Sequence, residues 1–204
     1  VNGILDAGIA TLSSTGFGAR WGGLVLGDYT SSLIDLSGTH IVEASSAITI
    51  PSLGTVDASS ALFARSSGSD PLIQISSGSS AAINVRNSEF HDGGSGCIFA
   101  YPSQSVLTLS GVELDSCNGP GIWARQVDLQ IDGLKIGENI SSGMELTGVT
   151  GSAKNIDANS FNGDGNVLWL ESIDGEFSVE GFSATTSGTA AIAGTTNREL
   201  ILSN

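Results

Sequence analysis

Positive charge is the scarcest property of this sequence. Lys and Arg number 7 in 204 residues against 21 Asp and Glu, which gives a formal net charge of −14 at pH 7. Proteins that bind nucleic-acid phosphates or anionic membrane surfaces do so through clustered Lys and Arg. The composition therefore argues against both kinds of partner.

Long apolar runs and cysteines are scarce as well. No apolar run reaches the roughly 18 residues that a membrane-spanning helix needs, so we expect no membrane insertion. The only cysteines, Cys97 and Cys117, fit either one disulfide or two free buried thiols. No set of Cys and His residues has the spacing of a zinc site.

Small residues are abundant instead. Gly, Ser and Thr make up more than a third of the chain, while aromatic residues make up 6%. Such a composition is typical of flexible linkers, but disorder requires few apolar residues, and 40% of this chain is hydrophobic. We therefore expect one folded domain over residues 1–204, in which small residues allow close packing and residues 1–20 form either an irregular N-terminal cap or an extra coil. Surplus acid with little Lys fits an extracellular, marine or salt-rich setting.

A short triplet of an apolar, an outward and an apolar residue recurs along the chain. The first residues of successive triplets are 24, 25, 25, 24, 22, 24 and 22 positions apart. Alternation with a period of two residues predicts β-strands with one buried face. The triplets begin at Leu24, Ile48, Ile73, Ile98, Ile122, Met144, Leu168 and Ala190.

A second, longer series lies between these triplets, with steps of 22, 27, 24, 22, 22 and 26 residues. A small residue at the fifth place of each member predicts a bend with left-handed backbone. The members begin at Ile34, Val56, Ile83, Leu107, Leu129, Gly151 and Phe177, and the bend residues are Gly38, Ser60, Asn87, Gly111, Gly133, Asn155 and Gly181.

Two series with one drifting period predict a solenoid, because a repeat this short holds strands but no additional helix. Each repeat is then one coil, whose strands pair with the coils above and below. Irregular coils of 22 to 27 residues from about Gly22 to Ile192 resemble the right-handed parallel β-helix of the pectin-lyase-like superfamily. The resemblance implies an all-β column of about eight coils. It implies no single activity, because that superfamily includes lyases, glycosidases, adhesin shafts and phage tailspikes.

In a solenoid, outward residues of successive coils form stripes along the column. One such stripe carries opposite charges in alternation, as a cross-strand ion ladder would, and we interpret it as structural. Its members are Arg86, Ser110, Asp132, Lys154 and Glu180.

An acidic cluster is predicted on two adjacent coils, where Glu89 lies beside Glu113 and His91 beside Asp115. Paired carboxylates are the groups that a general acid and base need at a sugar bond. Asp92 and Asp115 provide oxygen ligands of the kind that calcium prefers, and calcium is the one cofactor considered. A solvated acidic face is the simpler interpretation, and the motifs of polygalacturonase-like glycosidases are missing apart from a partial match at residues 91–94.

An aromatic face is predicted on another side of the column. Phe99, Trp123 and Trp169 share one outward position, Tyr101 lies two residues beyond Phe99, and Glu145 lies between the two tryptophans. Large aromatic side chains at solvent positions mark binding surfaces, and sugar rings stack on them. The alternative is that a loop, 116–121 or 159–165, folds over these rings.

Three functions follow from these patterns. The first is a non-catalytic segment of a longer secreted or cell-surface protein, which binds a glycan or partner through the aromatic face. The second is a lyase or hydrolase acting on an acidic polysaccharide through the acidic cluster. The third is a purely structural shaft, and end-to-end or lateral self-association of such columns is also expected, because uncovered coil ends expose strand edges.

Overall fold

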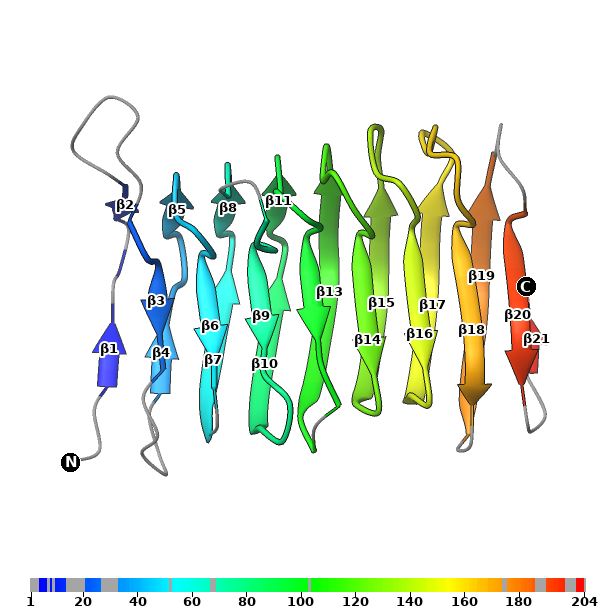
Figure 1. The fold of residues 1–204 in the computed structure, drawn as a ribbon, viewed down its shortest axis with the longest axis horizontal. Coiled ribbons are helices and arrows are strands. Elements are labelled where there is room, and N and C mark those ends of the chain that lie inside the picture. Colours follow the sequence, from blue (N-terminus) through cyan, green and yellow to red (C-terminus); the bar gives the residue numbers. More distant parts are fainter. Residues whose placement is uncertain are drawn as a thin grey trace.

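The computed structural model describes residues 4–6, 8, 10–13, 21–26, 33–51, 53–66, 69–102, 104–173, 176–185, 190–196 and 201–203. All regular elements in these ranges are β-strands, and all strand pairs are parallel. Figure 1 shows the strands side by side along one axis, in sequence order, with the two termini at opposite ends. In the part of the chain described, no helix could cross a membrane.

The larger sheet has 13 strands and wraps two sides of the column. In the first coils a bend separates two strands, and from β13 to β19 one bent strand covers both sides. The strands are β1 (Ile4–Asp6), β4 (Leu33–Asp35), β7 (Leu53–Ser59), β10 (Ser80–Arg86), β13 (Val106–Asp115), β15 (Asp128–Ile136), β17 (Thr150–Ala158), β19 (Phe177–Ala184) and β21 (Ile201–Ser203), with the short β2 (Thr11–Leu12), β5 (His40–Val42), β8 (Leu62–Ala64) and β11 (Glu89–His91).

The smaller sheet has eight strands and closes the column. Counted around the axis, the described chain makes about six turns, so the expected number of about eight coils is slightly too high, because strands at the ends belong to partial turns. The strands are β3 (Leu24–Val25), β6 (Ile48–Ile50), β9 (Ile73–Ile75), β12 (Ile98–Ala100), β14 (Ile122–Arg125), β16 (Met144–Thr147), β18 (Leu168–Ile173) and β20 (Ile192–Thr196).

The strand register confirms the repeat. Every start predicted for the longer series pairs with its neighbour in the next coil, including the weakest one, Gly151, which pairs with Leu129 and Phe177. The triplet series is correct up to Leu168 and wrong at its last member. Leu168 pairs with Ile192 rather than with Ala190. The connection between the two strands is therefore two residues longer than the predicted step of 22.

The predicted bends are confirmed at all seven positions, where φ lies between 47° and 77°. At Gly111 the reason for glycine is visible, because an added Cβ would lie 2.6 Å from Oδ1 of Asn87 in the preceding coil. Asn87 and Asn155 adopt the same backbone with a side chain, as asparagine does more readily than most residues. The bend turns the chain from one side of the larger sheet to the next.

The core is a set of aliphatic rows that run along the column axis. Ile48, Ile73 and Ile98 pair in register and are each at most 1% exposed. Phe63 and Phe90 stack in the same way on the larger sheet, with ring centroids 4.8 Å apart. Each coil buries its apolar side chains against the next, so the column is rigid and its outward positions are fixed in space.

Strands continue at both ends of the described column. β1 pairs with β4 and β2 with β5, so the described part of residues 1–20 contributes strands to the larger sheet, while much of the expected N-terminal cap lies outside the described residues. At the other end, β21 pairs with β19.

Candidate functional site

The aromatic face lies on the smaller sheet, as predicted. Phe99 on β12 pairs with Trp123 on β14, Trp123 pairs with Glu145 on β16, and Glu145 pairs with Trp169 on β18. These side chains point outward because they alternate with buried residues along each strand. All are half-buried, so each ring keeps part of its surface exposed.

The first part of this face is a packed group, the Trp123 cluster, which consists of Phe99, Tyr101, Trp123 and Arg125. The Trp123 ring lies 5.6 Å from that of Phe99 and 5.1 Å, edge-on, from that of Tyr101. The Arg125 guanidinium lies 5.5 Å from the Trp123 ring centroid. Aromatic pairs and cation–π contacts of this geometry stabilise the folded chain. Much of the Trp123 surface is therefore engaged by the protein itself.

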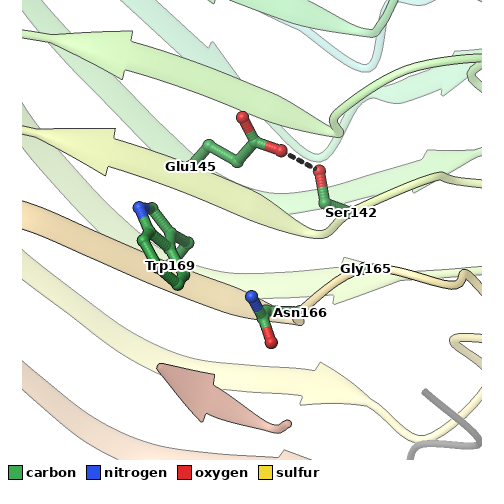
Figure 2. Close-up of a pocket in the computed structure, with 5 residues that line it drawn as sticks. All are labelled: Ser142, Glu145, Gly165, Asn166 and Trp169. Atoms are coloured by element: carbon green, nitrogen blue, oxygen red, sulfur yellow. Dashed lines mark hydrogen bonds between the residues drawn. The ribbon is translucent and has the colours of Figure 1, made fainter. Parts of the chain in front are cut away.

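The second part is the Trp169 pocket, a hollow of about 230 Å³ lined by Ser142, Glu145, Gly165, Asn166 and Trp169. Figure 2 shows Glu145 and Trp169 on neighbouring strands, with Asn166 beside the start of the Trp169 strand. The Ser142 hydroxyl donates a hydrogen bond of 2.5 Å to Oε1 of Glu145. Within the described residues, Trp169 contacts no other aromatic ring and no cation.

A glycine brings the loop before β18 to this pocket. The Gly165 amide donates a hydrogen bond of 2.9 Å to the Ser141 carbonyl, and an added Cβ at Gly165 would lie 2.9 Å from the Cβ of Ser142. The loop 159–165, expected as a cover for the rings, thus ends at the rim of the Trp169 pocket. Sequence reasoning missed Ser142, Gly165 and Asn166, although each lies within three residues of the start of a repeated strand.

The acidic cluster also has the predicted register. Glu89 pairs with Glu113, and His91 pairs with Asp115. His91 lies between two carboxylates, with Nε2 3.3 Å from Oε2 of Glu89 and Nδ1 3.7 Å from Oδ2 of Asp115. The other oxygen of Asp115 accepts a hydrogen bond of 2.9 Å from the Glu138 amide. The protein thus supplies partners for both carboxylate oxygens of Asp115.

Lys135 is a member of this cluster that sequence reasoning missed. Its Nζ lies 2.7 Å from Oε1 of Glu113, so the cluster includes a paired cation. The hydrogen bond to Glu113, and then the charge of that carboxylate, raise the pKa of Lys135 above its usual value. The register could have revealed the pair, since Glu113 and Lys135 are strand neighbours.

A shallow hollow of about 320 Å³ lies beside this ion pair. It is lined by Gly111, Val112, Glu113, Gly133, Leu134, Lys135, Asn155 and Asp157. Of the four predicted catalytic residues, only Glu113 lines this hollow. Glu89, His91 and Asp115 lie outside it. Among the residues described here, no three His, Cys, Asp or Glu side chains form a group that could hold a metal ion. Asp92, the other predicted metal ligand, is exposed at a turn with φ of 56°.

The charged stripe is only partly an ion ladder. Lys154 and Glu180 form an ion pair of 3.3 Å, but Asp132 accepts a hydrogen bond of 2.7 Å from the Asn155 side chain instead. No ion pair joins Asp132 to Lys154 in the described ranges. Both partners of the remaining pair are about half exposed, so it contributes little to stability.

Cys97 and Cys117 form a disulfide, with their Cα atoms 5.6 Å apart. Cys97 directly precedes β12 and Cys117 lies in the loop before β14, so the bond ties together the two coils that carry Phe99 and Trp123. Both cysteines are fully buried. Disulfides persist in oxidising compartments, so this one indicates an extracytoplasmic environment.

Parallel strands that wind around one apolar core define the chain as a parallel β-helix. Residues 24–196 match the family model described as the right handed beta helix region, and the chain belongs to this family. A search of curated proteins and a search of solved structures found no significant match.

Proposed function

We propose that this β-helix is a non-catalytic extracellular or cell-surface segment that binds carbohydrate through its aromatic face. The observation that carries the proposal is the Trp169 pocket, where a half-buried indole lies beside a carboxylate and an amide. An indole offers a broad apolar surface for a sugar ring, and polar groups around it fix the orientation of the hydroxyls.

The rigidity of the sheet supports this proposal. The pocket lies on strands β16 and β18, which pair over four residues and are anchored by fully buried Met144 and Leu168. A preformed surface loses little conformational entropy on binding, so weak stacking contacts are sufficient for measurable affinity. The surface charge also bears on the ligand, because a chain of net charge −14 repels polyanions.

A glycan panel with two variants tests the proposal. We expect Trp169→Ala to weaken glycan retention about tenfold, as loss of one stacking contact does, while circular dichroism shows an intact fold. Val25→Ala is the matched control, because Val25 is 62% exposed on the same face of the smaller sheet, at its far end. Equal retention by the Trp169→Ala variant and the unchanged chain contradicts the proposal and favours a structural shaft.

The same panel tests the enzyme alternative. Polysaccharides are incubated with the chain, with and without calcium, and analysed for shorter products. Product formation that is lost in Glu113→Gln would replace the proposed binding function by catalysis at the acidic cluster.

A further inference from the structure

The Trp169 pocket contains a carboxylate without a cationic partner. Glu145 lies between Trp123 and Trp169 in register and is half-buried. It accepts a hydrogen bond from the Ser142 hydroxyl and forms no ion pair with any described residue. The nearby Arg125 guanidinium is placed over the Trp123 ring instead. A half-buried carboxylate beside the Trp169 indole creates negative potential at the pocket.

Both components of this potential favour a cation. The faces of indole rings attract positive charge electrostatically, and an ionised carboxylate accepts hydrogen bonds from ammonium groups that are stronger than those from neutral donors. A uronate would meet repulsion from Glu145, and a neutral sugar would gain only neutral hydrogen bonds. Among uronates, neutral sugars and amino sugars, a sugar that carries a protonated amine therefore fits best.

The size of the pocket limits the ligand to a single ring. Its volume of about 230 Å³ is below the range of about 300 to 1,000 Å³ that is usual for drug-sized ligands. The pocket is open on the outward side of the sheet, so neighbouring sugars of a chain can extend along the aromatic face. These features fit one unit of an oligosaccharide rather than an extended peptide.

We propose that the Trp169 pocket binds a 2-amino-2-deoxyhexose unit whose protonated amine pairs with Glu145 while the sugar ring stacks on Trp169. This inference rests on the proposed carbohydrate-binding function and adds the class of sugar. Asn166 also lines the pocket, just before the strand that carries Trp169.

Three β-1,4-linked trisaccharides that differ only at C2 test the inference: triglucosamine, tri-N-acetylglucosamine and cellotriose. Affinities are measured by titration calorimetry at 0.15 M salt, which screens long-range attraction of the amine to the acidic chain. We expect triglucosamine to bind about tenfold more tightly than cellotriose, because a charge-assisted hydrogen bond replaces a neutral one. We expect this preference to vanish above the pKa of the sugar amine.

Two variants locate the effect. Glu145→Gln keeps an acceptor for Ser142 and should bring triglucosamine and cellotriose to equal affinity. Glu171→Gln is the matched control, because it removes the same charge from an exposed position on β18 and should leave the preference unchanged. A preference that survives in Glu145→Gln, or that Glu171→Gln abolishes equally, overturns the inference.

The remaining outcomes separate this inference from the proposed function. Equal affinity of the unchanged chain for the three trisaccharides, lost in Trp169→Ala, overturns the amine specificity and leaves carbohydrate binding intact. Binding of Nα-acetyl-lysine amide as tightly as triglucosamine shows that the pocket reads an ammonium group on a peptide, which also overturns it. No binding of any trisaccharide or of other glycans overturns both.

Discussion

Trp123 and Trp169 occupy the same outward position of the smaller sheet, two strands apart, yet their surroundings differ. Trp123 packs against two rings and a guanidinium, whereas Trp169 lines a pocket with polar neighbours. A disulfide fixes the coils around Trp123. The loop at the Trp169 pocket is held by hydrogen bonds such as that from Gly165 to Ser141.

This difference shows that a stripe of aromatic residues is not one site. The Trp123 cluster contributes mainly to stability, because its rings pack against one another. The Trp169 pocket leaves the indole available to a ligand. The comparison therefore predicts that changes at the two tryptophans separate stability from binding.

Loss of the disulfide should have the largest effect on the Trp123 side. A covalent link between residues 20 apart in sequence restricts the unfolded chain and contributes about 3 kcal/mol to the free energy of unfolding. We expect the double variant Cys97→Ser, Cys117→Ser to lose about this amount in urea denaturation, while affinity at the Trp169 pocket remains. Equal loss of glycan affinity would show that the two regions are coupled.

Replacement of each tryptophan by alanine should separate the two regions next. Both rings are half-buried, but the Trp123→Ala variant loses two ring contacts and a cation–π contact that Trp169→Ala does not lose. We expect Trp123→Ala to lower the free energy of unfolding by about 2 kcal/mol more than Trp169→Ala. Denaturation curves of the two variants measure this difference, and equal curves would contradict the assignment of Trp123 to a stabilising cluster.

Displacement of the loop should affect the Trp169 pocket alone. In Gly165→Ala the new Cβ would lie 2.7 Å from the Ser141 carbonyl oxygen, so the loop must shift. We expect glycan affinity to fall about fivefold with little change in the contacts of Trp123. Gly22→Ala is the control, since nothing lies within 4 Å of a Cβ at Gly22. Unchanged affinity in Gly165→Ala would argue against a role for this loop.

The smallest effect is expected at the acidic cluster, which lies on the larger sheet, whereas both tryptophans lie on the smaller sheet. Solvent screening limits the ion pair of Lys135 with Glu113 to about 0.5 kcal/mol. Because the pKa of Lys135 is raised in the folded state, this contribution is present at neutral pH and is lost as the pH rises through that raised pKa. Lys135→Gln should therefore be slightly less stable at pH 7, with the difference from the unchanged chain vanishing in strong alkali.

Much of the fold could be predicted because the strand signal repeats. The fifth-place residues identified the bends at Asn87 and Gly111, and alternation identified the outward position of Trp123. The prediction failed at Ala190, because the alternating apolar residues start two positions before Ile192, which is the residue that pairs with Leu168. The ion pair expected between Asp132 and Lys154 did not form, since register fixes the strand position of a side chain but not the partner it chooses.

The sequence alone determined the coil, the register and the bends of this protein. The reason is physical: alternating burial and small residues at left-handed positions act locally and recur in every coil. Only the tertiary structure decided that Cys97 meets Cys117 and that Trp169 rather than Trp123 faces a pocket. These outcomes depend on loops of unequal length and on side-chain packing between coils, neither of which a repeating pattern encodes.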